Sequence, residues 1–187
     1  NLEAGIGLSQ DGLAIEGVAD RGDEVFDAGL KALLSPVLDS FSRAVMLPAL
    51  GFVFLAPLMR WSPVPDRPAL HFVGSTGTRK TALLSLLQAF YGCHRFLLSW
   101  QSTGNHLEIA MSQTRDMVVT VDDLKATTSD RGVGRRVLQS YADRRGRGRA
   151  TRGGELARAR FAGGLLVSAG EDIPEGEASI AARSLFV

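Results

Sequence analysis

One stretch of the sequence limits the possible folds more than any other. It is Gly74-Ser-Thr-Gly-Thr-Arg-Lys-Thr81, which lies between two apolar runs, Ala69–Val73 and Ala82–Phe90. The first run has the length of a buried strand, and the second predicts a helix. A polyphosphate with Mg²⁺ is bound by backbone N–H groups, a helix N-terminus, an ammonium and a hydroxyl. A strand followed by a glycine-bearing loop, Lys-Thr and a helix supplies all four in this order. The residues expected to bind the nucleotide are Gly74, Ser75, Thr76, Gly77, Thr78, Arg79, Lys80 and Thr81.

Arg79 departs from this pattern, because a phosphate loop of this kind has glycine directly before its lysine. If the position requires a backbone angle that favours glycine, Arg79 weakens binding. If it does not, the guanidinium adds a phosphate contact. A glycine-rich turn with an incidental Lys-Thr pair is the structural alternative for the whole stretch.

A second run, Met117-Val-Val-Thr-Val, leads into Asp122 and Asp123. Ligands of open α/β sheets bind at the carboxyl ends of the strands, where these two acids are expected. We expect Thr81 and Asp122 to hold Mg²⁺, Lys80 to contact the phosphates, and Asp123 to orient or deprotonate the attacking water. Asp residues also occur in turns after strands, which is the structural alternative.

Two further residues are candidates for catalysis. Ser168 ends a fourth predicted strand and could sense the terminal phosphate or hold the water, although Ser also caps turns. Arg183 precedes the fifth predicted strand and could stabilise the charge on the transferred phosphoryl group from a neighbouring subunit. A surface ion pair with Glu175 or Glu177 is the alternative for Arg183.

Positive charge is concentrated between residues 131 and 160, where ten arginines face only two acids. The net charge of the whole chain is +1, so the remainder is acidic. An exposed arginine loop can follow a DNA backbone without reading its sequence, and a solvated surface loop is the alternative. The residues expected to contact DNA are Arg144, Arg145, Arg147, Arg149 and Arg152.

The predicted fold class is α/β, with a five-stranded and mostly parallel sheet that follows a short β element and a helical segment. The predicted organisation is residues 1–22 as the end of a β element, 23–60 as helix, 61–68 as a proline-rich linker, and 69–187 as the phosphate-loop core, without a lid. The strands are expected at Ala69–Val73, Arg95–Leu98, Met117–Val121, Gly164–Ser168 and Ser184–Val187. The covering helices are expected at Lys80–Tyr91, Asn105–Ser112 and Asp130–Ala142.

Composition adds to the expected setting of the protein. The chain has 187 residues, of which 45% are hydrophobic and 22% charged, which excludes a disordered tail or a disulfide scaffold. The single cysteine, Cys93, suits the cytoplasm. The uncharged run Ala44–Met59 is too short and too interrupted by proline to favour a membrane span, so no membrane partner is expected.

Taken in order, these residues resemble uncharacterised P-loop ATPase domains in the primase-helicases of phages, plasmids and integrative elements, which are related to the superfamily 3 and minichromosome-maintenance helicases. The resemblance rests on the loop, on Trp100 with Thr103-Gly-Asn-His-Leu-Glu108, on Val121-Asp-Asp-Leu124 and on Ser168-Ala-Gly-Glu171. It implies an AAA+-like sheet, a hexameric ring, a DNA-gripping loop before the fourth strand, and an arginine finger at Arg183. Asp123 stands where the family has glutamate.

The leading functional hypothesis is an ATP-hydrolysing, Mg²⁺-dependent helicase or translocase domain that acts on single-stranded or forked DNA in the replication of a phage or mobile element. Weak hydrolysis is expected from Arg79 and Asp123. One alternative is a nucleotide-binding module that closes a ring with little or no hydrolysis. Another is a small-molecule kinase, which would be a monomer with an acceptor pocket.

Overall fold

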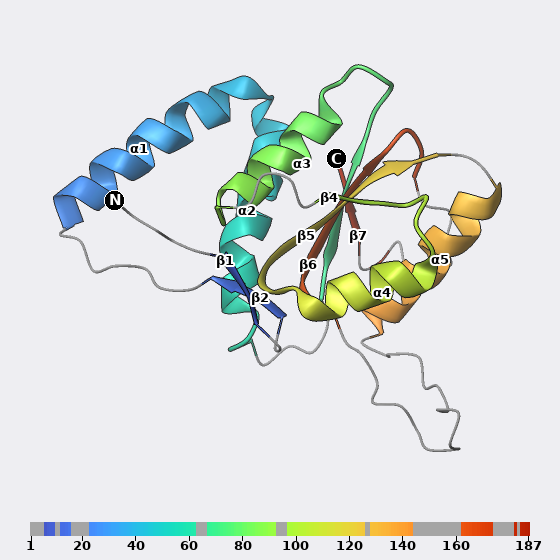
Figure 1. Ribbon diagram of the computed structural model, residues 1–187. Coiled ribbons are helices and arrows are strands. Elements are labelled where there is room, and N and C mark those ends of the chain that lie inside the picture. Colours follow the sequence, from blue (N-terminus) through green and yellow to red (C-terminus); the bar gives the residue numbers. More distant parts are fainter. Residues whose placement is uncertain are drawn as a thin grey trace.

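The protein is described by a computed structural model. The structure describes residues 6–9, 12–15, 23–62, 67–92, 97–125, 128–143, 162–173, 182 and 184–187. The chain runs from a small hairpin through two long helices into a sheet that alternates with helices (Figure 1).

The N-terminal part contains the expected β element and helical segment. Strands β1 (Ile6–Ser9) and β2 (Gly12–Ile15) pair antiparallel. Helices α1 (Asp23–Ser40) and α2 (Arg43–Leu58) follow. Within the described part of the chain, no helix is long and apolar enough to cross a membrane, and that includes α2.

The central sheet has the five predicted strands, and every neighbouring pair in it is parallel. They are β3 (Ala69–Val73), β4 (Leu97–Ser99), β5 (Arg115–Leu124), β6 (Gly163–Gly170) and β7 (Ser184–Phe186). The order across the sheet is β4-β5-β6-β3-β7. The strand that leads into the Gly74–Thr81 loop, β3, therefore lies between β6 and β7 rather than beside its neighbour in sequence.

Helices cover both faces of this sheet, as the predicted α/β class requires (Figure 1). Helices α2 and α3 (Lys80–Ala89) pack on one face, where Leu70, Val118 and Val167 share a core with Leu84. Helices α4 (Gly104–Gln113) and α5 (Thr128–Ala142) pack on the other. On that face the core contains Val119, Val121 and Leu166 from the sheet, together with Trp100, Leu107, Val137 and Leu138.

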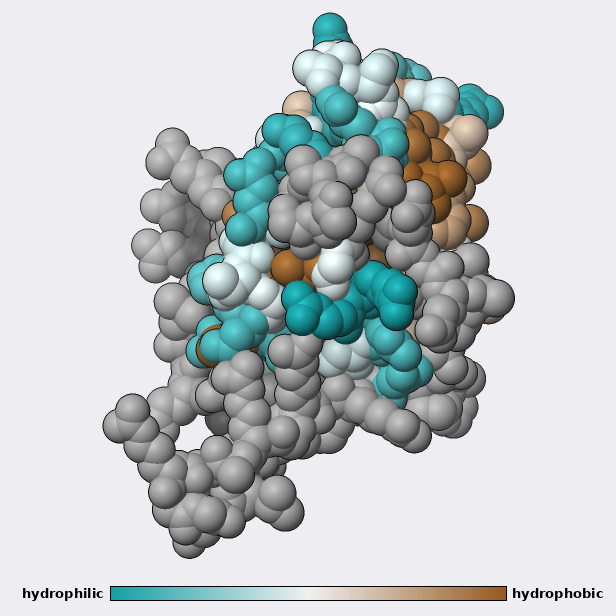
Figure 2. All heavy atoms as spheres, turned by 90° about the vertical axis from the view of Figure 1, so that its right-hand side faces the viewer, coloured by the Kyte–Doolittle hydropathy of each residue, from teal (hydrophilic) through white to brown (hydrophobic). Residues whose placement is uncertain are grey.

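Helix α5 separates its polar and apolar residues by helical spacing. Val137, Leu138 and Tyr141 are buried, whereas Arg135 and Arg136 are exposed. Figure 2 turns this side of the molecule toward the viewer, and its coloured residues are mostly hydrophilic, with hydrophobic ones gathered at the upper right. The arginine-rich composition of α5 is thus compatible with an amphipathic helix that covers the sheet.

The strand bounds differ from the prediction mainly at β5, which starts two residues earlier and ends three residues later than expected. The ladder with β6 has a register shift between Val121 and Leu124. Asp122 and Asp123 lie within this irregularity, and Asp123 has a φ of 65°. A bulge bends a strand and redirects its side chains, so it governs where the two carboxylates point.

Candidate functional site

The loop between β3 and α3 curls around the Lys80 side chain. The Lys80 Nζ donates to the carbonyl oxygens of Gly74 at 2.5 Å and Ser75 at 2.9 Å, and lies 3.3 Å from Thr78 Oγ1. The Gly74 N–H donates to Gly170 O at 3.1 Å, which ties the start of the loop to the end of β6. The ammonium is therefore held by oxygens of the loop, and Lys80 lines the cavity described below.

Two residues of the loop have left-handed backbone angles. Gly77 has a φ of 89°, which glycine adopts without steric cost. Arg79 has a φ of 62° and a ψ of 25°, a conformation that is costly for a residue with a Cβ. The sequence left open whether this position requires a backbone angle that favours glycine. The structure shows that Arg79 adopts such an angle, which is the condition under which Arg79 was expected to weaken binding.

The start of α3 has no side-chain cap and no acidic residue in its first turn. The first N–H groups of a helix lack partners within the helix, and the helix dipole adds partial positive charge there. Together with Lys80, this makes the helix start attractive to an anion.

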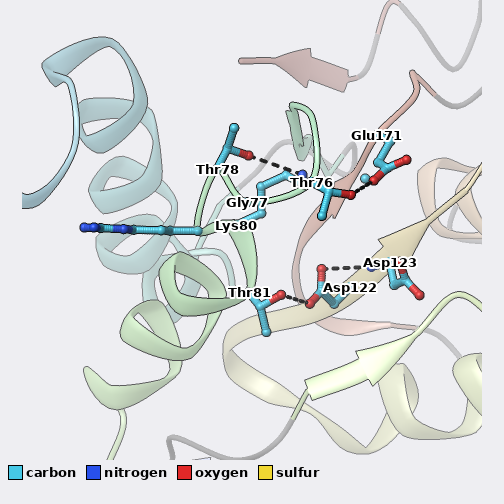
Figure 3. Close-up of a pocket in the computed structure, with 10 residues that line it drawn as sticks. Thr76, Gly77, Thr78, Lys80, Thr81, Asp122, Asp123 and Glu171 are labelled. Atoms are coloured by element: carbon cyan, nitrogen blue, oxygen red, sulfur yellow. Dashed lines mark hydrogen bonds between the residues drawn. The ribbon is translucent and has the colours of Figure 1, made fainter.

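Thr81 and Asp122 meet across the loop and the end of β5. The Thr81 Oγ1 donates to Asp122 Oδ2 at 2.6 Å, and the other Asp122 oxygen accepts from the Asp123 N–H at 2.8 Å. Figure 3 shows the two side chains facing each other below the loop. A hydroxyl and a carboxylate in contact are two of the hard oxygen ligands that Mg²⁺ prefers.

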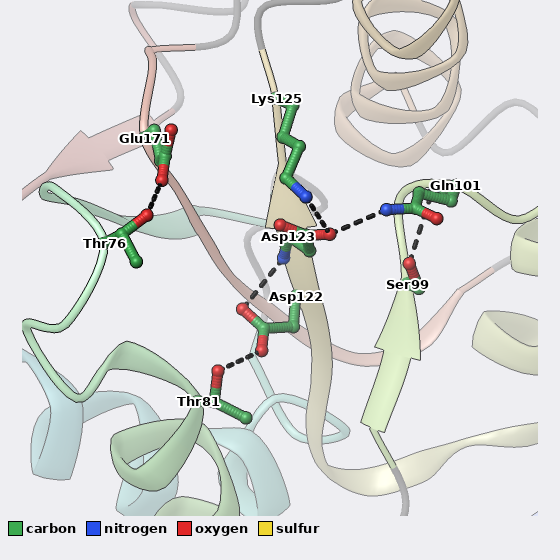
Figure 4. Close-up of polar contacts among 8 residues, drawn as sticks. All are labelled: Thr76, Thr81, Ser99, Gln101, Asp122, Asp123, Lys125 and Glu171. Atoms are coloured by element: carbon green, nitrogen blue, oxygen red, sulfur yellow. Dashed lines mark hydrogen bonds and ion pairs between the residues drawn. The ribbon is translucent and has the colours of Figure 1, made fainter.

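The Asp123 side chain is held by residues that follow β4 and β5, not by Thr81. Its Oδ2 accepts from Gln101 Nε2 at 2.7 Å and pairs with Lys125 Nζ at 3.1 Å. Figure 4 shows these three side chains together, with Asp122 turned toward Thr81 instead. The adjacent aspartates therefore make different contacts.

A cavity of about 540 Å³ lies over these groups, within the usual size range of ligand pockets. Its walls are formed by the loop, by both aspartates and by the end of β6. The lining residues are Thr76, Gly77, Thr78, Arg79, Lys80, Thr81, Asp122, Asp123, Gly170 and Glu171. The cavity thus brings together the predicted residues of the loop and of β5, while Gly74 and Ser75 lie behind Lys80 as its acceptors.

Ser168 does not line the cavity. Its side chain is buried, and its Oγ lies 2.6 Å from Nδ1 of His71, its partner in the β3–β6 ladder. The His71 Nε2 donates to the carbonyl of Asp172 at 2.9 Å, so Nδ1 is the acceptor for the Ser168 hydroxyl. Burial, and to a lesser extent the charge of Lys80, lowers the pKa of His71, which agrees with a neutral ring.

The remaining predicted site residues lie outside the described residues. They are Arg183 and the arginines Arg144, Arg145, Arg147, Arg149 and Arg152. Their proposed contacts with phosphate and DNA remain predictions.

A family model described as "Domain of unknown function (DUF927)" matches residues 41–161, well over half of the chain. The chain belongs to the DUF927 family. The match includes the loop, both aspartates and α5. No curated protein matches the chain.

The fold of this DUF927 domain is similar to that of a solved structure described as a helicase. A structure described as "SCCmec type IV Cch - active helicase" aligns with a TM-score of 0.55 and 20% identity, over 76% of this chain and 28% of that one. A JCV helicase crystal structure aligns with a TM-score of 0.43 and 17% identity, over 76% of this chain and 39% of that one. The chain thus spans under a third of Cch, and the likeness to Cch supports the α/β fold that was predicted.

The sequence did not predict the roles of three residues at the DUF927 site. Gln101 and Lys125 were not linked to Asp123, and Glu171 was not placed in the cavity. Each follows a strand of the sheet, so the rule that ligands bind at the carboxyl ends of parallel strands could have nominated all three. The rule does not say which of them face the loop.

Proposed function

We propose that this domain binds and hydrolyses ATP as the motor of a DNA helicase or translocase in the replication of a phage or mobile element. The observation that carries the proposal is the cavity over the start of α3, which is lined by Lys80 and by the hydrogen-bonded pair Thr81 and Asp122. This arrangement combines a cation for phosphate oxygens with oxygen ligands for a metal.

The phosphates would lie against the loop. Lys80 is bonded to loop carbonyls and can exchange those bonds for charge-assisted bonds to phosphate oxygens, which are stronger. The uncapped N-terminus of α3 supplies N–H donors at the same place.

Thr81 and Asp122 fit a Mg²⁺ ion. Among the described residues, no three His, Cys, Asp or Glu side chains converge on one point. Mg²⁺ in nucleotide sites is commonly held by one or two protein oxygens together with substrate phosphates and water, so the pair suffices. When bound, the ion neutralises charge that develops on the phosphates. The cavity contains two further carboxylates, Asp123 and Glu171, either of which is chemically able to take a proton from the attacking water.

DNA and neighbouring copies complete the proposal. Residues 144–160 are the candidate DNA contact, because clustered arginines bind phosphate backbones without reading sequence. Arg183 is the candidate residue acting on the site of a neighbouring copy, in a ring that we expect to be hexameric. Both parts rest on sequence and on the resemblance to primase-helicases.

The test is nucleotide binding by calorimetry with Mg²⁺ and ATP, followed by hydrolysis with and without single-stranded DNA. Lys80→Ala should weaken ATP binding about 10- to 150-fold, since a hydrogen bond to a charged group contributes about 1.5–3 kcal/mol. Lys31→Ala, on the exposed surface of α1, is the matched control and should bind as the wild type does. Equal affinity of the Lys80 and Lys31 variants would refute the site.

A nucleotide-binding module without turnover is the second candidate. The observation in its favour is that Asp123, the expected catalytic carboxylate, already has Lys125 and Gln101 as partners. Tight ATP binding combined with a hydrolysis rate no higher than that of Lys80→Ala, with DNA present, would favour it.

A further inference from the structure

Three carboxylates line the cavity, and their contacts differ. Asp122 accepts from Thr81, and Asp123 pairs with Lys125. Glu171 accepts from the hydroxyl of Thr76, at the tip of the phosphate loop. Among the described residues, ion pairs involve Asp123 and Asp116 but not Glu171. Figure 4 shows Glu171 beside Thr76, on the side away from Gln101 and Lys125.

Asp123 is poorly disposed to act as the base. Its Oδ2 already accepts from an amide and pairs with an ammonium, so only Oδ1 is left to take a proton from water. Its φ of 65° within the β5 bulge directs the side chain toward β4. Aspartate is also one methylene shorter than glutamate, which reduces its reach toward a water near Lys80.

Glu171 is held in place through its backbone. Its N–H donates to Leu124 O at 3.1 Å, and the carbonyl of the preceding Gly170 accepts from Gly74 at 3.1 Å. The carbonyl of the following Asp172 accepts from buried His71. The segment is thus fixed to β5, to the phosphate loop and to β3, and this preorganisation suits a reacting group.

Gly170 is part of the same arrangement. A Cβ at this position would lie 2.6 Å from the Leu124 Cβ, closer than side chains pack. Only glycine lets the ends of β6 and β5 approach this closely, and the approach brings the next residue, Glu171, into the cavity.

We propose that Glu171, rather than Asp123, is the catalytic base of this domain; the inference rests on the proposed ATPase function. In the step, the water oxygen forms a bond to the γ-phosphorus while the bond from phosphorus to the β,γ-bridging oxygen breaks. The electron pair of the broken bond leaves on ADP, and the proton of the water passes to a carboxylate oxygen of Glu171. The single bond from Thr76 occupies one acceptor site of a carboxylate that has about four, so capacity for the water remains.

The experiment compares Glu171→Gln with Asp123→Asn in the full chain, measuring the Kd for ATP with Mg²⁺ and the DNA-stimulated kcat. Glu171→Gln should lower kcat by about 100-fold or more, the range of a general base, and should change Kd by less than about threefold. Asp123→Asn should lower kcat by about tenfold or less. Asp116→Asn, at the other end of β5, is the control for loss of a carboxylate.

Two further readouts separate catalysis from tethering of the loop. The acid limb of the kcat–pH profile should disappear in Glu171→Gln, and nucleotide recovered from that variant should be intact ATP. Thr76→Val removes the same loop contact, so it should raise KM and lower kcat much less than Glu171→Gln does. An equal fall in kcat in both variants would mean that Glu171 only positions the loop, and the proposal would be wrong.

The remaining outcomes separate the two proposals. If wild type hydrolyses ATP, Lys80→Ala does not, and Asp123→Asn loses as much activity as Glu171→Gln or more, the ATPase function stands and the assignment of the base is overturned. If wild type binds ATP without turnover, hydrolysis and the assignment both fail. If wild type binds no ATP, the whole site is overturned.

Discussion

Arg79 provides a test of the backbone geometry of the loop between β3 and α3, and this test needs no ligand. Its φ of 62° lies in the left-handed region, which costs a residue with a Cβ about 1–2 kcal/mol. Arg79→Gly removes that cost but increases the freedom of the unfolded chain, by about 0.4–1 kcal/mol. The net expectation is a gain of about 0.5–1 kcal/mol in the free energy of unfolding.

Arg79→Ala is the matched variant, because it removes the same side chain and keeps the Cβ. Arg79 is exposed, so the alanine variant should stay within about 0.5 kcal/mol of wild type. For 187 residues, an unfolding entropy of about 2.1 cal/mol/K per residue converts 1 kcal/mol into about 2.5 °C.

Thermal unfolding followed by circular dichroism should therefore place the glycine variant about 1–3 °C above the wild type and above the alanine variant. A glycine variant no more stable than the alanine variant would show that the position carries no strain. The same proteins separate the two roles considered for the side chain, because a phosphate contact by the guanidinium would make both variants bind ATP more weakly.

Two further predictions concern the contacts around β6. Burial lowers the pKa of His71 below its ordinary value of 6.5. Between the pKa of the folded and that of the unfolded chain, the unfolded chain therefore binds more protons. The free energy of unfolding should fall as the pH drops below about 6.5. Denaturant unfolding at pH 7.5 and 5.5 should show a smaller decline for His71→Gln than for wild type, and an equal decline would contradict this. Gly170→Ala should cost about 1–3 kcal/mol, because its Cβ would lie 2.6 Å from the Leu124 Cβ. Gly51→Ala, in α2 with open space around it, should be neutral or stabilising by up to about 1 kcal/mol, and similar melting temperatures for the two variants would refute the packing argument.

Local sequence determined the types of the elements and part of the site. The spacing of apolar residues, together with glycine and proline at the ends of segments, predicted the five strands and three covering helices. These signals come from residues close together in the chain. Asp122 and the loop between β3 and α3 were predicted as site residues for the same reason. The chemistry proposed for them depends on a strand, a loop and a helix in immediate succession, and on acids at the end of a second strand.

Tertiary structure determined which side chains meet in the cavity. The order β4-β5-β6-β3-β7 places β6 between the two strands that carry the predicted site, which brings Glu171 to the loop between β3 and α3. Register and side-chain alternation turned Ser168 toward His71 and away from the cavity. The bulge in β5 directed Asp123 toward Lys125.

The elements follow from short-range patterns, since burial on one face imposes a period that a few residues reveal. The partners of each catalytic candidate depend on strand order, register and one bulge. Strand order, register and the bulge are fixed by packing between segments that are far apart in the chain, so a local sequence pattern does not predict them.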